Sequence, residues 1–398
     1  MKTKIAFIGY SLFAGGAEAN IINILPYLTS NGFDPELLLF KNINEYKFQY
    51  TKRLKKMHIY SLLNTQRKFS FIERPLMILG LIINAFRKIK KENYKVLVAL
   101  VEYDPFFLTI FFSVILRKKG ILIVGDNLAE DLKRKPLVTR YLYALLFNLS
   151  FKLADKIICV SKGLGKNLQD NFHIPKHKIH IIYNGVNVKA IKNKAKTKLS
   201  EKYERFMRNH DVIVMLSRLV PKKGHTFVLN TLPSIITLFP RIKLYIIGQG
   251  SQYKLLKEKV KHLHLQNYVV FHGFEKTNPY KYIQKARLFL FSSVYEGFGN
   301  VLIEAMACGT PVISTNCQYG PKEILLNSKY GILTPSFAEN KKAGDYLVNA
   351  VQSLLLAKNR RSHYKQMGLK RANDFTATTM SQGYYKVISE LLDHEKKD

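Results

Sequence analysis

Two carboxylates, Glu296 and Glu304, lie eight positions apart with two glycines between them. The surrounding stretch, residues 288–315, reads LFLFSSVYEGFGNVLIEAMACGTPVIST. It predicts a strand at 288–291, a helix at about 300–308 and a second strand at 312–314. Glu296 would then lie in the turn and Glu304 in the helix, where carboxylates beside apolar residues need polar partners.

The turn before this helix suits an anion. Gly297 and Gly299 let the backbone approach a ligand closely, and a helix that begins at Asn300 presents amide groups and a positive dipole end. Amides for a phosphate and carboxylates for hydroxyl groups together favour a sugar joined to a phosphate. Either glutamate alone is also compatible with a surface or capping role, and the combination favours a binding site.

The sequence EGFGNVLIEAMACGTPVIS resembles the E-x7-E signature of family 4 glycosyltransferases, which are retaining enzymes of the GT-B fold. The resemblance implies an α/β protein with two Rossmann-like, doubly wound domains that face each other across a cleft. It implies that Glu296 meets the hexose of a nucleotide-sugar donor and that Glu304 meets the ribose. The residues expected to contact the donor in this stretch are Gly297, Phe298, Gly299, Asn300, Val301 and Glu304.

Two cations, Arg218 and Lys223, follow the strand predicted at 211–216. A guanidinium fork and a compact ammonium group at the end of a strand can clamp a diphosphate. The segment resembles the GR-x-K-G pattern of the family, which assigns both residues to the leaving diphosphate; a solvated lysine-rich loop is the alternative. Because the chain has no D-x-D, we expect no metal ion and no cofactor, and charge neutralisation is left to these cations and the helix amides.

Two further loops at predicted strand ends are candidates for donor binding. Gly248 follows the strand at 243–247, in a loop that resembles the family. Gly273 and Phe274 follow the strand at 269–271, where the family seats its nucleobase; a core position is the alternative for Phe274.

Candidate acceptor-side residues lie in the first half of the chain. Gly15 and Gly16 follow a strand at 4–9 and resemble the family's first loop, although a tight turn is the alternative. Asp126 and Asn127 follow a strand at 121–124. The family commonly has His or Arg in the first of these places, so Asp126 is a departure. It would accept a hydrogen bond from a hydroxyl group or assist deprotonation of the acceptor, and helix capping is the alternative for both residues.

The alternation of strand and helix signals predicts four segments. These are an acceptor-binding domain at 1–190, a linker at 191–210, a nucleotide-sugar-binding domain at 211–370, and a helix at 371–398 that crosses back to the first domain. The 398 residues, 47% of them hydrophobic, suffice for two such cores. Three cysteines without CxxC spacing favour a reducing compartment over a disulfide or zinc framework.

The formal net charge of +35 favours an anionic partner. A basic amphipathic helix predicted at 72–91 is a candidate for a membrane interface, although such helices more often pack on a sheet. The longest apolar run, at 105–116, is shorter than the roughly 20 residues that cross a bilayer. No nucleic-acid partner is expected, because the basic residues lack interleaved aromatic side chains. We therefore expect a cytoplasmic protein on the inner face of the membrane.

The resulting functional hypothesis is the retaining transfer of a hexose or N-acetylhexosamine from a UDP-linked sugar. The acceptor would be a lipid-linked saccharide or lipopolysaccharide in the synthesis of cell-surface polysaccharide, as the GPKEIL segment at 320–325 resembles a subgroup with that role. Two alternatives stay open. One is a sugar-nucleotide epimerase of the same fold, and the other is a basic nucleic-acid- or membrane-binding scaffold without activity.

Overall fold

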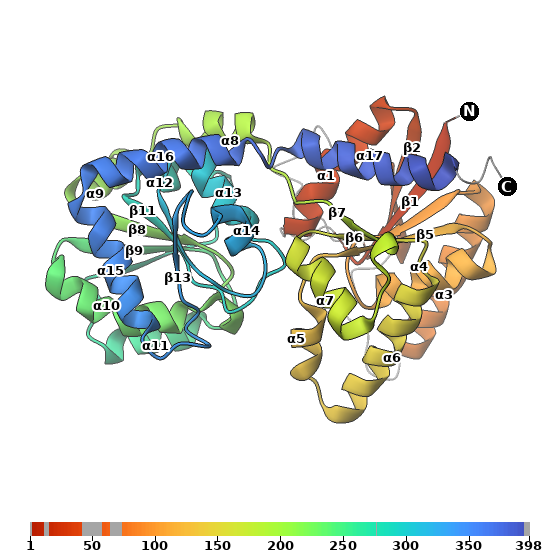
Figure 1. Cartoon of the computed structure of the whole chain (residues 1–398), viewed down its shortest axis with the longest axis horizontal. Helices are drawn as coiled ribbons and strands as arrows, with labels where there is room; N and C mark the ends of the chain where they lie inside the picture. The colour runs from red at the N-terminus through yellow and green to blue at the C-terminus, as the bar shows by residue number, and fades with distance from the viewer. Residues whose placement is uncertain (1, 12–15, 42–57, 64–73, 276, 394–398) are drawn as a thin grey trace. The chain divides into compact units, whose positions relative to one another are not determined.

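A computed structural model describes residues 2–11, 16–41, 58–63, 74–275 and 277–393. The backbone forms two compact units, each built on its own sheet (Figure 1). Unit 1 comprises Met1–Gly185 together with Ala377–Asp398, and unit 2 comprises Val186–Thr376. The chain therefore leaves unit 1, builds the whole of unit 2, and returns.

Unit 1 contains a parallel sheet of seven strands in the order β3-β2-β1-β4-β5-β6-β7. The sequence order reverses between β1 and β4, so this is the switch point at which doubly wound sheets bind ligands. The strands are β1 (Thr3–Gly9), β2 (Phe33–Lys41), β3 (His58–Leu63), β4 (Val96–Ala99), β5 (Lys119–Val124), β6 (Lys156–Cys159) and β7 (Ile179–Ile181).

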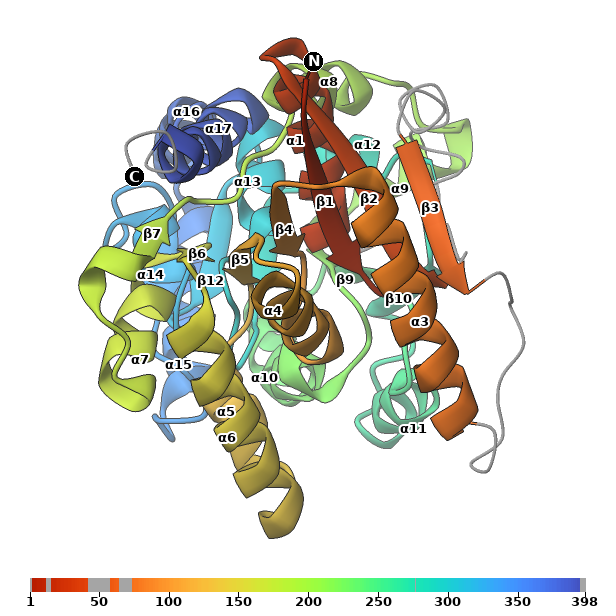
Figure 2. The same cartoon turned by 90° about the vertical axis from the view of Figure 1, so that its right-hand side faces the viewer.

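Helices cover both faces of this sheet. On one face α1 packs against α17, and on the other lie α3, α4 and α6 (Figures 1 and 2). The described helices of unit 1 are α1 (Gly16–Ser30), α3 (Arg74–Glu92), α4 (Asp104–Ile115), α5 (Leu128–Lys133), α6 (Leu137–Leu153), α7 (Lys162–Phe172) and α17 (Ala377–Asp393), with a 3-10 turn at Lys176–Lys178.

Unit 2 contains a parallel sheet of six strands in the order β10-β9-β8-β11-β12-β13, with its switch point between β8 and β11. The strands are β8 (Asp211–Leu216), β9 (Ile242–Ile247), β10 (Val269–Gly273), β11 (Leu288–Phe291), β12 (Val312–Thr315) and β13 (Ile332–Thr334). Its helices are α8 (Val188–Ala195), α9 (Glu201–Asn209), α10 (His225–Leu238), α11 (Tyr253–His262), α12 (Tyr280–Lys285), α13 (Asn300–Ala307), α14 (Pro321–Leu325), α15 (Ala343–Leu356) and α16 (Lys358–Ala372), with a 3-10 turn at Pro221–Lys223.

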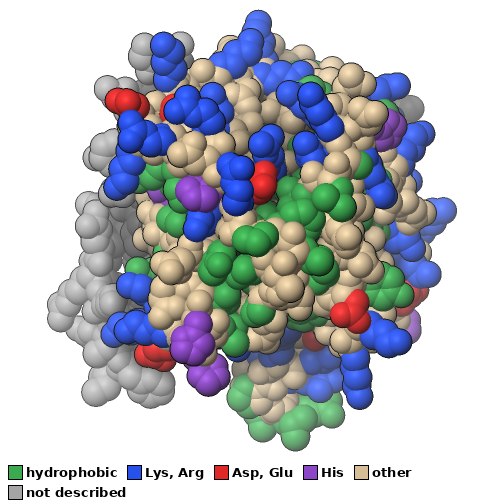
Figure 3. Space-filling model, turned by 90° about the vertical axis from the view of Figure 1, so that its left-hand side faces the viewer, with side chains coloured by type: hydrophobic (Ala, Val, Ile, Leu, Met, Phe, Trp, Pro, Cys, Tyr) green, Lys and Arg blue, Asp and Glu red, His purple; other side chains and the backbone are tan. Residues whose placement is uncertain are grey.

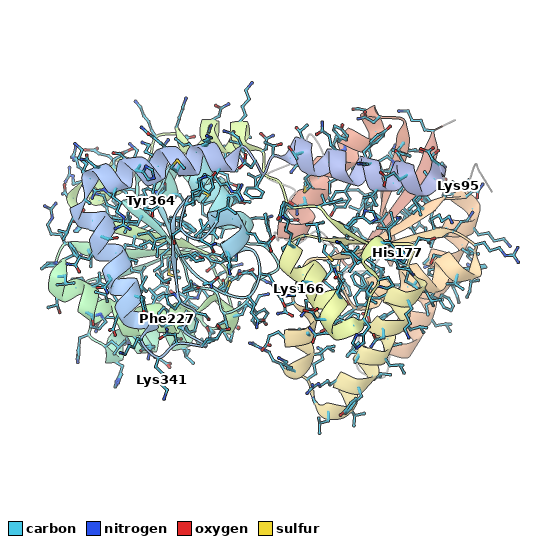
Figure 4. The ribbon with its side chains drawn as sticks, in the orientation of Figure 1. Lys95, Lys166, His177, Phe227, Lys341 and Tyr364 are labelled. Carbon is cyan, nitrogen blue, oxygen red and sulfur yellow. The ribbon has the colours of Figure 1, made fainter. Side chains whose placement is uncertain are left out.

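Burial and capping explain these elements. Central strands such as β4 and β11 are buried along their whole length, because helices cover both faces of a parallel sheet. Ser161 caps α7 by accepting a hydrogen bond from the Leu164 amide, as its place at a strand exit predicts. Outside the sheets, Phe227, which Figure 4 labels, stacks on Phe337 with ring centres 4.4 Å apart.

Two expectations can be compared with the local structure. The structure describes the helix predicted at 72–91 from Arg74 onward, and among its residues 79–92 Leu81, Ala85 and Ile89 are buried, whereas Leu79 and Ile83 are exposed. The segment predicted as a linker at 191–210 contains most of α8 and all of α9, so it is largely helical. The four domain boundaries stay predictions.

No helix among the described residues combines the length and the apolar composition needed to cross a bilayer.

Candidate active site

The centre of the candidate site in unit 2 is an ion pair between Lys223 and Glu296. Lys223 follows β8 and Glu296 follows β11, the two strands that flank the switch point, so the topology brings their carboxyl ends together. The Lys223 ammonium group donates to Glu296 Oε1, and Ser293 Oγ donates to the same oxygen at 2.6 Å. Both charged side chains are largely buried, at 14% and 12% exposed.

The backbone around this pair is closely fitted. Ser292 Oγ donates to the Lys223 carbonyl oxygen at 2.8 Å, which ties the β8 loop to the β11 loop. Gly224 adopts a φ of +68°, and a Cβ added there would lie 2.0 Å from the Ser292 carbonyl oxygen. Only glycine fits this close approach, so the position of Lys223 is fixed by the packing of its neighbours.

The second carboxylate, Glu304, lies within α13, which begins at Asn300 as the sequence predicts. Gly299 precedes the helix with a φ of +104°, and no side chain caps the helix amides. Burial raises the pKa of Glu304 to about 7, and the nearby Lys194 acts in the opposite direction. A ligand hydroxyl group that donates a hydrogen bond to this half-buried carboxylate would stabilise its charged form.

The other residues predicted around this turn divide into two groups. The Phe298 side chain is buried and lies edge-on to Phe375, with ring centres 5.4 Å apart. It therefore packs in the core of unit 2, and its backbone rather than its ring is the part placed near the turn. Gly297 is also buried, whereas Asn300 and Val301 are partly exposed at the first turn of α13.

The loops after β9 and β10 lie beside the β8 loop. Gly248 donates its amide hydrogen to the Gly273 carbonyl oxygen at 2.8 Å, and a Cβ on Gly248 would lie 1.9 Å from the Ser217 carbonyl oxygen. Gly273 has a φ of +84° with open space where a Cβ would point, and Phe274 is 41% exposed. These loops thus leave an exposed aromatic ring beside a glycine, as a nucleobase would need.

Arg218 is exposed and precedes the buried Leu219. The two cations predicted to act together are thus in different environments: Lys223 is held in an ion pair and Arg218 is open to solvent. An exposed guanidinium group can swing onto an anionic ligand, whereas Lys223 is already positioned.

In unit 1 the predicted Asp126 lies in the loop after β5. Its amide and that of Gly125 donate to Glu102 Oε1 at 2.9 Å and 2.7 Å, respectively. Asn127 is buried and caps α5, accepting a hydrogen bond from the Glu130 amide at 3.2 Å. The structure therefore gives the Asn127 side chain the capping role that was one of its two interpretations, while Asp126 lies beside a second carboxylate.

Burial, followed by the negative charge of Asp126, raises the pKa of Glu102 to about 7, although the hydrogen bonds from the Gly125 and Asp126 amides act in the opposite direction. Glu102 follows β4, so unit 1 also has a carboxylate beside its switch point.

The first loop of unit 1 is predicted to bind through Gly15 and Gly16. Gly15 lies outside the described residues. Gly16 is the first residue of α1.

A metal ion would need several close ligands. Among the described residues, no group of three His, Cys, Asp or Glu side chains is placed to hold one.

Two family models divide the chain between them. Residues 14–190 match "Glycosyltransferase Family 4", and residues 191–371 match "Glycosyl transferases group 1". The chain belongs to glycosyltransferase family 4. This family 4 enzyme is 27% identical over 395 residues to the N-acetylgalactosamine-N,N'-diacetylbacillosaminyl-diphospho-undecaprenol 4-alpha-N-acetylgalactosaminyltransferase of Campylobacter jejuni, with 97% of this chain and 99% of that protein covered.

Solved structures agree with the fold of this glycosyltransferase. Anabaena HepE in complex with UDP-glucose superimposes with a TM-score of 0.79 at 22% identity, covering 97% of this chain and 99% of that one. A lipopolysaccharide outer core galactosyltransferase in its apo form gives a TM-score of 0.68 at 20% identity, covering 98% and 99% of the two chains. The glycosyltransferase thus has the GT-B fold, with two Rossmann-like units, as the sequence predicts.

Three polar residues of the glycosyltransferase escape the sequence analysis. Glu102 ends the apolar run of β4, so its place at a strand exit is a signal that could have identified it. Lys194 lies in the segment predicted as a linker, and no motif in the sequence around it indicates that it is close to Glu304. Glu275 follows Phe274, where burial raises its pKa but hydrogen bonds from Thr277 and Asn278 outweigh this effect and hold the pKa at about 2.

His225 is a fourth such residue, and its role is structural. It is buried, and its Nε2 lies 3.0 Å from Ser217 Oγ. Burial and the charge of Lys223 lower its pKa to about 4, so the imidazole is neutral near pH 7. A neutral ring between β8 and α10 adds no charge to the Lys223–Glu296 pair.

Proposed function

We propose that this glycosyltransferase moves a hexose or N-acetylhexosamine from a UDP-linked sugar to a lipid-linked saccharide or lipopolysaccharide acceptor, with retention of the anomeric configuration. Unit 2 would hold the donor and unit 1 the acceptor. The observation that carries the proposal is the buried Lys223–Glu296 pair at the switch point of unit 2. It combines a cation for a phosphate with a carboxylate for sugar hydroxyl groups.

Three features of unit 2 support a nucleotide-sugar donor. The amino end of α13 lies next in sequence to Glu296 and offers amides to the diphosphate. Glu304 lies within the same helix, where its carboxylate would accept from the ribose. The exposed Phe274 ring would support the base. The solved complex of HepE with UDP-glucose favours uridine as that base.

The reaction begins with departure of the diphosphate from the anomeric carbon. Lys223, Arg218 and the α13 amides would stabilise the negative charge that develops on the leaving oxygen. The acceptor hydroxyl group then attacks the same face of the sugar, and the departing phosphate oxygen helps to take its proton. Asp126 in unit 1 would accept a hydrogen bond from the acceptor hydroxyl group or assist its deprotonation.

The acceptor assignment rests on relatives and on charge. The Campylobacter jejuni relative is named for a diphospho-undecaprenol substrate, and a structural neighbour is named for the lipopolysaccharide outer core. The net charge of +35 suits phosphate-bearing lipids on an anionic membrane surface, and Figure 3 shows a face on which Lys and Arg far outnumber Asp and Glu. We accordingly place the enzyme on the inner face of the cell membrane.

The test is a panel of nucleoside diphosphates and their sugars. We expect a UDP-sugar to raise the melting temperature most, because a ligand at 100 times its dissociation constant adds about 2.7 kcal/mol to the free energy of unfolding. The stabilising donor is then incubated with a lipid-diphosphate saccharide, and the anomeric coupling of the product is read by NMR. Stabilisation by no activated sugar, or isomerisation of the donor without an acceptor, would contradict the proposal.

A further inference from the structure

An apolar stripe runs along the outside of α6 in unit 1. Five of its side chains recur every fourth position, so they share one face of the helix, and two more lie beside them. Their exposed fractions run from 46% to 82%. The residues of this α6 stripe are Leu137, Val138, Tyr141, Leu142, Leu145, Leu149 and Leu153.

The opposite face of α6 is the one that packs in the protein. Phe147 and Phe151 are buried, and Phe147 lies edge-on to Phe106 of α4 with ring centres 6.2 Å apart. The Tyr143 ring also lies edge-on to the Tyr103 ring, with ring centres 5.0 Å apart. A helix already held by one face does not need a second apolar face for folding, so the stripe is suited to contact with something outside unit 1.

The charges around the stripe are basic. Within α6 the charged residues are Arg140 and Lys152, both exposed. Lys133, Arg134 and Lys135 come immediately before the helix. The two acids of the preceding α5 are already engaged, since Glu130 pairs with Lys133 and Asp131 accepts from Tyr103.

The shape of the unit fits a flat surface better than a groove. The end of unit 1 formed by α5 and the start of α6 projects beyond its other helices in both views (Figures 1 and 2). The stripe spans 17 residues, or about 25 Å at 1.5 Å per residue. A helix whose exposed face is apolar, with cations beside that face, can lie in the plane of a membrane interface.

We propose that the α6 stripe inserts shallowly into the headgroup region of an anionic phospholipid bilayer, with the exposed Arg140 and Lys152 contacting lipid phosphates. A second copy of this chain is a poorer occupant, because it would bring the same cations together. The inference rests on the proposed function for its lipid acceptor and deepens it by naming the docking element.

Docking through α6 has a consequence for the acceptor site. Tyr103 contacts Tyr143 and Phe147 of α6, and its neighbour Glu102 holds the amides of Gly125 and Asp126. Packed side chains therefore connect the membrane-bound helix to the Asp126 loop without a flexible joint. A lipid-linked acceptor would meet that loop at a fixed height above the bilayer.

The chain contains no tryptophan, so a single introduced indole reports on its own surroundings. Leu145→Trp places the probe in the stripe, and Leu356→Trp places a matched probe at a residue of unit 2 with similar exposure, 69% against 66%. Each is mixed with vesicles of phosphatidylglycerol and phosphatidylcholine, with phosphatidylcholine alone, and with neither. Brominated lipids measure depth.

We expect a blue shift and bromine quenching for the Leu145 probe on anionic vesicles and little change for the Leu356 probe. Leu142→Glu with Leu145→Glu should weaken vesicle binding about 10-fold or more, since charged side chains enter the interface poorly. Leu356→Glu is the control. Binding of vesicles without a shift at Leu145, or a concentration-dependent shift without vesicles, would overturn the proposal. Donor stabilisation is measured separately on the same variants, so a failure of docking and a failure of the glycosyltransferase function are distinguishable.

Discussion

Both units place a carboxylate beside the switch point of their sheet, but they treat its charge differently. In unit 2, Glu296 follows β11 and is paired with Lys223 and Ser293. In unit 1, Glu102 follows β4 and is surrounded by backbone amides and by Asp126. One site is neutralised by a cation, and the other concentrates negative charge.

The difference matches what each half of a glycosyl transfer requires. A leaving diphosphate needs positive charge, which in the proposed reaction Lys223 would supply without reorganisation because its position is already fixed. An acceptor hydroxyl group needs a hydrogen-bond acceptor, and in the proposed reaction Asp126 would supply it beside Glu102. One architecture therefore supplies opposite electrostatics through the residues at its strand ends.

The largest effect should come from removing the cation of unit 2. We expect Lys223→Ala to lower turnover about 100-fold or more, because one donor to a developing charge is lost. The neighbouring Lys222→Ala is the matched control, since its ammonium group lies 5.0 Å from the Tyr295 ring and not in the pair with Glu296. Steady-state kinetics with a saturating donor provide the measurement.

The stability of the Lys223 variant needs its own control. Leaving a buried charge unpaired typically costs about 3–5 kcal/mol, so melting curves must first show that the variant is folded at the assay temperature. Turnover of folded Lys223→Ala close to that of Lys222→Ala would show that unit 2 does not depend on this cation, and the contrast between the units would fail.

The acidic site of unit 1 should give the next largest effect. Asp126→Asn is expected to lower turnover about 10- to 100-fold, because one hydrogen bond to a charged group is lost. Steady-state kinetics provide the measurement.

Glu102→Gln tests the neighbouring carboxylate, since it keeps an oxygen for the Gly125 and Asp126 amides but removes the charge. Since the pKa of Glu102 is about 7, wild-type turnover should rise with pH through that region, and the Gln variant should lack this rise. Parallel pH profiles for both proteins would contradict the role assigned to Glu102.

Glu304→Gln should separate binding from stability within unit 2. Its pKa is raised from 4.5 to about 7, so its contribution to stability is present below about pH 4.5 and is lost as the pH rises through about 7. Without a ligand, the variant should therefore melt higher than wild type at about pH 8 and the two should converge at lower pH. Donor affinity should fall about 10-fold through loss of a charged hydrogen bond, as measured by calorimetry. A variant that binds donor normally would remove Glu304 from the site.

The smallest effect is expected at the base-binding loop. Phe274→Ala should weaken donor binding by a few-fold, because an exposed ring adds about 0.5–1.5 kcal/mol through stacking. Tyr253→Ala, which alters an aromatic side chain of similar exposure on α11, is the control. An equal effect of both substitutions would point to stability instead of base contact.

The contrast between the units also appears in what the sequence reveals. In unit 2 the strand at 211–216 matches the prediction residue for residue. The sequence also marks Lys223 and Glu296 as site candidates, although their direct ion pair is a finding of the structure. Short apolar strands and glycine turns specify both positions through local chemistry, because their backbone conformations tolerate few alternatives. The motif does not reveal Lys194, whose effect on Glu304 depends on how α8 packs against α13.

Unit 1 is harder to interpret from its sequence. The helix predicted for a membrane interface, α3, has Leu81, Ala85 and Ile89 buried on the sheet, and its Lys88 pairs with Glu36. By contrast α6, for which the sequence suggests no interface, carries an exposed apolar stripe along its whole length. Both helices are apolar on more than one side, and hydrophobic periodicity alone does not tell which side faces the core. The functional role of Asp126 likewise remains a prediction.

The return of the chain to unit 1 has a consequence for protein engineering. The Val186 amide donates to the Phe375 carbonyl oxygen at 2.9 Å, and Val186 forms a parallel bridge with Thr376. The first and last residues of unit 2 are therefore paired with each other, and chain segments bridged in this way lie about 5 Å apart. A gene that splices residue 185 directly to residue 377 would encode unit 1 with barely any gap to close, and the excised piece would have adjoining ends suited to cyclisation.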